Sequence, residues 1–167
     1  MRQRGLVLLL SLTLMLLLGL LGLSALGSAI QQERMARNLR STLQAFEQAQ
    51  QLLQQAELRA LEQAGPRCEF CLPPPEAGLI TSGGVYAGAG ASSGLVWQAG
   101  DGGFYLIQPL GESTQARQMP PGLAVALYRI TAVARNGTAR SVLESVIAQP
   151  VGPASQPWRR ILWRQVY

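Results

Sequence analysis

The sequence contains no histidine and no lysine, and only two of its 167 residues are cysteines. Without histidine, a Ser-His-Asp triad, a histidine-based zinc site and a histidine general base are all excluded. Two cysteines are too few for a four-thiolate metal site, and no serine begins a Ser-x-x-Lys motif that would supply an activating base. We therefore expect a protein that is not an enzyme and that holds neither a cofactor nor a metal.

Charged residues are also scarce. They make up 14% of the chain, against about a quarter in average soluble domains, while hydrophobic residues make up 48% and aromatic residues only 6%. The net charge is +5, and every basic residue is arginine. The length suits one compact domain plus an appendage. Together these values indicate that part of the chain avoids water.

The hydrophobic residues are concentrated near the N-terminus, where no charged side chain occurs between Gly5 and Gln32. As a helix, residues 6–30 rise about 37 Å, which exceeds the roughly 30 Å of a bilayer's hydrocarbon core. The run is also longer than the about 7–15 apolar residues of a cleaved signal peptide. We predict a transmembrane helix over residues 6–30, surrounded by membrane lipid, after a cytoplasmic leader of residues 1–5. Because most of the chain follows the span, the head is expected outside the cytoplasm.

Small residues interrupt the leucine run at Gly19, Gly22, Ser24 and Ser28. Small side chains allow another membrane helix to approach closely, so these four are candidate packing positions. They are equally compatible with mere interruptions of a leucine-rich span. Hydroxyl groups within the run are expected to bond to carbonyls of the preceding turn.

A second helical segment follows directly, because residues 31–64 contain no glycine or proline and are rich in good helix formers. Nothing separates it from the span, so we predict one continuous helix that ends at Gly65-Pro66. We expect its apolar stripe to pack on the protein's own sheet rather than on a partner. The stripe consists of Leu39, Leu43, Phe46, Ala49, Leu53, Ala56 and Ala60.

Residues 65–94 are rich in cysteine, proline and glycine and are predicted to form a connecting loop. Cys68 and Cys71 lie in a C-x-x-C motif just after the helix. Outside the cytoplasm, we expect a disulfide that holds the proline-rich turn. A thioredoxin-like redox function would need a βαβ context that this position does not offer, and pairing with other chains is the remaining alternative.

The remaining residues, 95–167, predict a head of four or five antiparallel strands. Turns are indicated at Gly100–Gly103 and at Asn136-Gly137, the strongest short hairpin signal. A last strand is expected near the C-terminus, with Ile161, Trp163 and Tyr167 on one face. The predicted fold class is therefore α+β, a long helix packed on a small antiparallel sheet.

Arginine and tryptophan alternate near the C-terminus, in the segment Trp158–Arg164. Such a pattern can stack on bases and contact phosphates. A head outside the cytoplasm does not meet DNA, so we expect no nucleic-acid partner. The segment is better interpreted as an edge strand guarded by arginines, or as a surface for another subunit.

A short basic leader ending in glycine, followed by an apolar helix that continues into an α+β head, is similar to the plan of type IV pilins. More narrowly, the chain resembles the PilX-type minor pilins of pilus assembly. The matching segments are Gln3-Arg4-Gly5, the leucine run, Glu33-Arg34-Met35-Ala36-Arg37-Asn38 and Ala45-Phe46-Glu47, with Tyr128-Arg129-Ile130-Thr131 similar to the family's late strand.

This resemblance implies that a prepilin peptidase cuts between Gly5 and Leu6 and leaves Leu6 as an N-methylated N-terminus, where most pilins carry phenylalanine. It implies a single-pass protein of the inner membrane with a periplasmic head, later part of a pilus. The implied partners are other minor pilins, the major pilin and the inner-membrane assembly platform. The implied roles are pilus assembly, twitching motility and cell adhesion.

The chain departs from the pilin pattern at Leu10, where the family has a glutamate five residues into the mature protein. In pilins that carboxylate is taken to pair with the N-terminal amine of a neighbour, and a subunit with Leu10 cannot supply this charge. The K-type tip subunit of type II secretion pseudopili is similar in this respect. We therefore expect a minor pilin at or near the pilus tip. The alternatives are a type II secretion minor pseudopilin and a signal-anchored envelope scaffold or adhesion protein.

Overall fold

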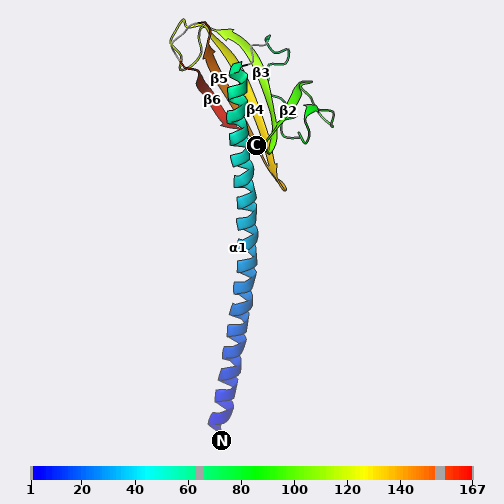
Figure 1. Ribbon diagram of the computed structural model, residues 1–167. Helices are drawn as coiled ribbons and strands as arrows, with labels where there is room; N and C mark the ends of the chain where they lie inside the picture. The colour runs from blue at the N-terminus through cyan, green and yellow to red at the C-terminus, as the bar shows by residue number, and fades with distance from the viewer. Residues whose placement is uncertain (1, 63–65, 153–156, 167) are drawn as a thin grey trace. The chain divides into compact units, whose positions relative to one another are not determined.

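The computed structural model describes residues 2–62, 66–152 and 157–166. The chain has the α+β, pilin-like fold predicted from the sequence: one long N-terminal helix, α1 (Arg2–Glu62), followed by a six-stranded antiparallel sheet (Figure 1). It divides into two compact units, residues 1–40 and residues 41–167, with the boundary inside α1. Each unit is described by itself below.

The first unit is a single helix, and its large apolar side chains are exposed. The large apolar side chains of residues 6–30 are all more than half exposed. An 18-residue window of the helix reaches a mean hydropathy of 2.7. The hydroxyl of Ser11 donates to the carbonyl of Leu8, and that of Thr13 to the carbonyl of Leu10, each at 2.9 Å. These bonds confirm, for Ser11 and Thr13, the expectation that hydroxyls inside the run bond to carbonyls of the preceding turn.

The sheet of the second unit is a simple meander in which each strand pairs with the next along the chain. The strands are β1 (Gly84–Val85), β2 (Val96–Gly100), β3 (Gly103–Ser113), β4 (Val125–Asn136), β5 (Ala139–Pro150) and β6 (Arg159–Gln165). The sheet has six strands where the sequence predicted four or five, and the additional strand β1 comes from two residues of the expected connecting loop that pair with β2.

Both predicted hairpin turns are present. Gly100 pairs with Gly103 across the β2–β3 turn, where Gly102 has a φ of +80°. In the β4–β5 hairpin Asn136 pairs with Ala139, so the two turn residues are Gly137 and Thr138 rather than Asn136 and Gly137. The φ of Gly137 is +60°, and glycine at the first turn position is typical of a type II′ hairpin.

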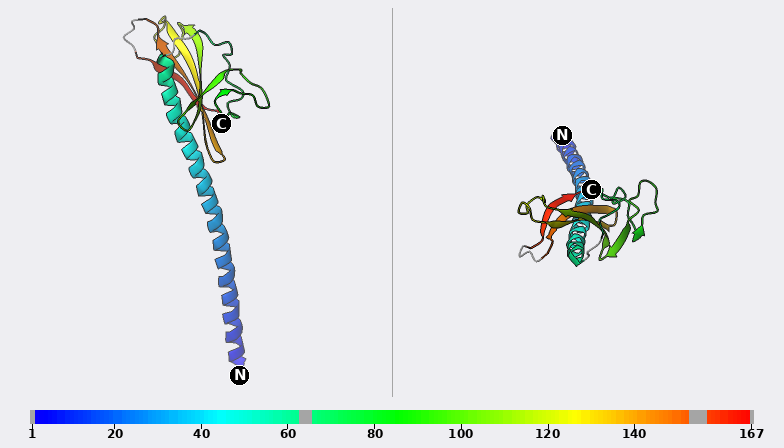
Figure 2. Two further views of the ribbon diagram at one scale, coloured as in Figure 1. Left: turned by 45° about the vertical axis from the view of Figure 1, so that its right-hand side comes forward. Right: turned by 90° about the horizontal axis from the view of Figure 1, so that it is seen from above.

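In the second unit, the last turns of α1 lie across one face of the sheet (Figure 2). The buried stripe differs from the predicted one, because Leu39 and Leu43 are exposed whereas Ala45 and Leu52 are buried. Burial begins only where the sheet covers the helix, and small alanine side chains then let the two backbones approach closely. The buried positions are Ala45, Ala49, Leu52, Leu53, Ala56, Glu57 and Ala60.

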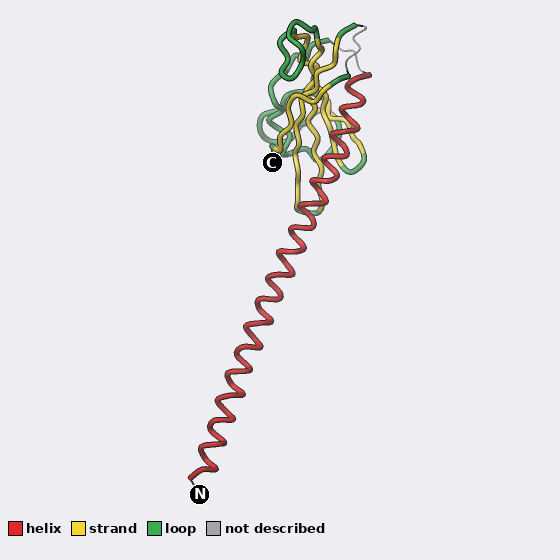
Figure 3. The backbone as a smooth tube through the Cα atoms, turned by 90° about the vertical axis from the view of Figure 1, so that its left-hand side faces the viewer, coloured by secondary structure: helices red, strands yellow, loops and turns green. Residues whose placement is uncertain are grey.

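The two faces of the sheet carry separate cores. On the helix face, Tyr105, Ile130 and Leu143 pack against the buried stripe. On the opposite face, Trp97 and Leu106 pack with Ile80 and neighbouring residues of the loops before β2. Much of the loop backbone lies on this side in Figure 3. The loops therefore act as the second cover of the sheet.

The last strand contains an irregularity that the sequence did not reveal. Val146 pairs with Leu162 but Ile147 pairs with Arg160, so Ile161 is an extra residue in β6. Such a bulge places both Ile161 and Leu162 on the same side of the strand. Ile161 therefore packs with Val125 on the face away from the helix, whereas Trp163 contacts Phe46 of α1. The prediction that Ile161 and Trp163 share a face is wrong, and Tyr167 lies outside the described residues.

Candidate functional site

The candidate processing and assembly positions lie in the first unit. Gly5 is inside α1, and the side chains of Leu6 and Leu10 are 69% and 63% exposed. The helix is long and apolar enough to be a membrane anchor, a property that it shares with signal sequences. An exposed leucine at position 10 is compatible with lipid or with an apolar neighbour, and it brings no charge to either.

The four small residues of the apolar run do not form one stripe. At about 100° per residue, Gly19 and Gly22 lie on one side of the helix, and Ser24 and Ser28 lie on the opposite side. A β-carbon added to either glycine would meet nothing within 4 Å. The glycines therefore leave open space that a neighbouring helix can enter.

The segment that resembles the family motif is helical and exposed. Arg37 forms an ion pair with Glu33 one turn earlier, and the side chain of Met35 is 64% exposed. Arg34 is exposed too, and Asn38 takes part in an interaction of its own. Exposed pairs of this spacing stabilise a helix by about 0.3–0.5 kcal/mol, so the pair supports local helicity and little else.

Cys68 and Cys71 form a disulfide with each other. Backbone carbonyls of this short loop accept hydrogen bonds from side chains of the sheet. Gln108 of β3 donates to the carbonyls of Phe70 and Leu72 at 2.7 and 3.0 Å, and Arg129 of β4 donates to that of Cys71. The disulfide loop is thus fixed to the face of the sheet that α1 does not cover.

A buried carboxylate on the same face links three strands. Glu144 of β5 is only 2% exposed, and its Oε1 accepts from Arg164 of β6 at 2.9 Å. Its Oε2 lies 3.7 Å from Nε of Arg129, the residue that also bonds to Cys71. Polar contacts therefore run from the disulfide loop to the last strand.

A second buried carboxylate connects the helix to the same strand. Glu57 of α1 is 1% exposed, and Arg160 of β6 donates to its two oxygens at 2.6 and 2.8 Å. Breaking a buried pair of this kind is costly because it leaves one charge without compensation. β6 is thus held by an ion pair on each of its two faces.

Glu76 is a third buried carboxylate, and no ion pair to it occurs within the described residues. It accepts hydrogen bonds from the backbone N–H of Ser93 at 3.0 Å, from the Ser93 hydroxyl and from Nε1 of Trp97 at 3.1 Å. Burial by itself raises the pKa of this carboxyl, but the hydrogen bonds outweigh burial and hold the pKa below its usual value. Glu76 therefore joins the two loops that cover the second face.

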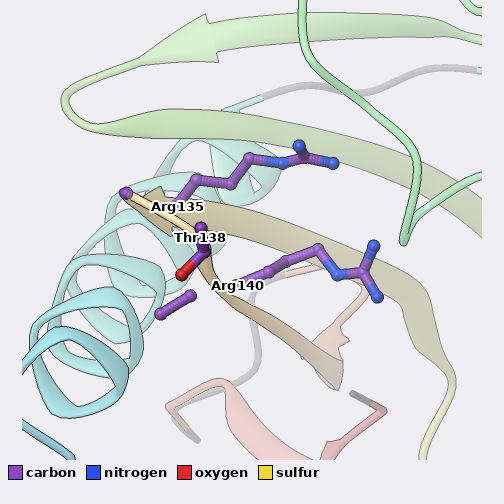
Figure 4. Close-up of a pocket in the computed structure, with 5 residues that line it drawn as sticks. Arg135, Thr138 and Arg140 are labelled. Atoms are coloured by element: carbon purple, nitrogen blue, oxygen red, sulfur yellow. The ribbon is translucent and has the colours of Figure 1, made fainter. Parts of the chain in front are cut away.

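A surface hollow of about 380 Å³ lies at the β4–β5 turn, lined by Arg135, Thr138 and Arg140 together with Gly137 and Ala139. Figure 4 shows the two arginine side chains extending in the same direction. They face each other across the strand pair, and both donate to the carbonyl of Gly78. This shared acceptor offsets the repulsion expected between like charges, so the arginines hold the loop in place.

No family model, curated protein or solved structure matches the chain. Within the described ranges, no group of three acidic or cysteine side chains is placed to hold a metal ion. The features that bear on function are therefore the exposed apolar helix, the head and the contacts between strands.

Sequence reasoning did not find the buried carboxylates. A signal was present for Glu57, because it lies three or four residues from Leu53 and Ala60, on the apolar stripe itself. An acid at such a position needs a cation, and the arginine-rich C-terminal strand was the available source. Glu76 and Glu144 carry no comparable pattern, because their partners are brought together only by the folded sheet.

Proposed function

We propose that this protein is a minor pilin that takes part in the assembly or initiation of a type IV pilus, at or near the tip. One observation carries the proposal: the exposed apolar segment and the segment packed on the sheet belong to one helix, α1, without a break. A subunit built this way can leave the membrane with its anchor attached to its head.

The physical basis is an exchange of surroundings. In the bilayer, lipid covers the exposed leucines of residues 6–30. In a fibre, the apolar helices of neighbouring subunits cover them. Lipid tails are as apolar as leucine, so close packing and charge pairing decide between the two states rather than hydrophobicity. Gly19 and Gly22 provide room for that packing.

Leu10 favours a position at an end of the fibre. An internal subunit of the family plan supplies a carboxylate to the amine of its neighbour, and Leu10 supplies none. A terminal subunit lacks one neighbour and needs no such charge. We expect Leu10→Glu to leave pilus initiation intact or to increase incorporation of the subunit. Loss of initiation in this variant, with normal protein levels, would argue against the tip position.

Mass spectrometry of the mature N-terminus tests the proposal. A minor pilin is expected to begin at an N-methylated Leu6 after cleavage behind Gly5. An intact Met1 would instead favour the alternative of a signal-anchored envelope protein. A Gly5→Ala variant is the control, because it keeps the apolar run and removes only the glycine on which the peptidase chiefly relies.

The second alternative, a type II secretion minor pseudopilin, predicts the same cleavage. Deletion of the gene separates the two functions. A pilus protein affects surface fibres, twitching motility and adhesion, whereas a pseudopilin affects the release of secreted enzymes.

A further inference from the structure

The last strand, β6, forms one border of the sheet, and no described strand lies beyond it (Figure 1). The backbone N–H of Val166 donates to the carbonyl of Val142 of β5 at 2.8 Å. Backbone groups of an antiparallel strand point alternately toward and away from the partner strand. Trp163, an odd number of residues earlier, therefore turns its N–H and C=O away from β5. Outward backbone groups of this kind are a template for another strand.

Two of the three arginines of β6 turn away from this border. Arg160 bends onto the helix face to bond Glu57, and Arg164 bends onto the opposite face to bond Glu144. Exposed apolar side chains near the outward backbone include those of Leu162 and Trp163, which are 42% and 44% exposed. Native edges are usually protected by free charges, prolines or bulges. Here the bulge lies at Ile161, and pairing with β5 is regular after it.

We propose that the free edge of β6 binds an extended, acidic segment of another protein as a seventh strand of the sheet. The segment 159–166 contains three arginines and no acid. Glu57 and Glu144 are already bonded to arginines, and Arg159 is exposed without an ion pair among the described residues. The free positive charge at this border is therefore that of Arg159, and an acidic residue of an added strand would complement it.

A second copy of this chain fits the same edge poorly. Antiparallel pairing of β6 with itself would place no acid opposite Arg159, because the segment 159–166 contains none. In the proposed pilus the partner is a neighbouring subunit, so its identity rests on the proposed function. Strand binding itself depends only on the head.

The test uses the full chain in detergent micelles and a labelled synthetic peptide of about eight residues, the length of an ordinary strand. The peptide alternates valine or threonine with glutamate, and a control peptide has lysine in place of each glutamate. We expect saturable binding of the acidic peptide, measured by fluorescence anisotropy, with at least tenfold weaker binding of the lysine peptide. Hydrogen exchange should show that the acidic peptide protects the amide of Trp163.

Two variants at one position isolate the backbone contribution. Trp163→Ala and Trp163→Pro both remove the indole, but only proline removes the outward N–H. Proline is tolerated in edge strands at such positions, so β5–β6 pairing should persist, as checked by exchange of β5 amides. We expect Trp163→Pro to bind the acidic peptide at least fivefold more weakly than Trp163→Ala.

Arg159→Glu provides a test that does not depend on the fold of the proline variant. This exposed substitution should weaken binding of the acidic peptide about tenfold. Equal binding of the acidic and lysine peptides, or unchanged binding in Arg159→Glu, would overturn the proposal. Self-association of the chain that Trp163→Pro abolishes would also overturn it, in favour of a second copy. None of these outcomes depends on cleavage after Gly5, so this proposal and the pilin proposal fail separately.

Discussion

The apolar side chains of α1 are exposed in one part of the helix and buried in another. In residues 6–30 the helix is dominated by leucine, and all of these large side chains are more than half exposed. In residues 45–60 the buried positions are mainly alanine, and they are almost completely covered by the sheet. One helix therefore carries an exposed apolar surface in residues 6–30 and, in residues 45–60, a surface that is buried against the sheet.

The difference follows from what each surface must contact. In the proposed function, lipid or neighbouring helices surround the leucines of residues 6–30, and both can adapt to leucine side chains on all sides of the helix. A twisted sheet has a fixed shape, and alanine allows the helix backbone to approach it, while Leu52 and Leu53 fill the remaining space. Gly100 belongs to the same fit, because a β-carbon there would collide with Leu52. Stability of the head should thus depend on individual side chains, whereas the apolar run should tolerate change.

The largest effect is expected from a matched pair of leucine truncations. Leu53→Ala should lower the free energy of unfolding of the head by about 3 kcal/mol, because it opens a cavity against the sheet. Leu17→Ala in the exposed run should change it by less than about 0.5 kcal/mol. All three tryptophans lie in the second unit, so tryptophan fluorescence during guanidinium unfolding in micelles reports on the head alone. Equal losses of unfolding free energy in the two variants would contradict the expected difference between the two parts of α1.

Removal of the cation at the buried Glu57 should have the next largest effect. Arg160→Met leaves this carboxylate without its partner and should cost about 2 kcal/mol, less than for a fully buried pair because a third of the Arg160 side chain is exposed. The double variant Glu57→Met, Arg160→Met should recover most of the loss. If the double variant does not recover this stability in the same unfolding assay, Glu57 and Arg160 do not stabilise each other in the fold.

Loss of the disulfide should have a smaller effect. Replacing Cys68 and Cys71 by serine is expected to destabilise the head by about 1–2 kcal/mol, since the closed loop is very short. Bonds from Gln108 and Arg129 should still hold the loop carbonyls. Hydrogen exchange of the β3 and β4 amides would stay slow in this variant, and global exposure of those strands would show that the disulfide organises the whole face.

The smallest change is expected at Glu76 and depends on pH. The pKa of this carboxyl is lower in the folded head than its usual value of about 4.5, so the ionised form stabilises the fold at neutral pH. That contribution is complete above about pH 5 and disappears as the pH falls through the lowered pKa. Glu76→Gln should cost about 1 kcal/mol at pH 7 and show a flatter stability profile between pH 5 and 3. A variant profile as steep as that of the unmodified protein would assign the acid sensitivity to other carboxylates.

The sequence predicted those parts of the fold that local patterns determine. The absence of glycine and proline in residues 31–64 indicated a helix, and Asn136-Gly137 indicated a hairpin. The contacts that join distant segments could not be derived. The bulge at Ile161, which places Arg160 and Trp163 on one face, depends on the register with β5 and has no local signature. The buried stripe of α1 also differs from the predicted one. The position of the sheet, and not the spacing of apolar residues along the helix, decides where burial begins.

In the function that we propose, the exposed apolar run serves assembly of a surface fibre. The most direct test counts surface fibres by electron microscopy in cells that lack this protein and in the same cells with the gene restored. We expect few or no fibres without the protein and recovery of the fibres when the gene is restored. Normal numbers of fibres of normal length in the deleted cells would contradict it.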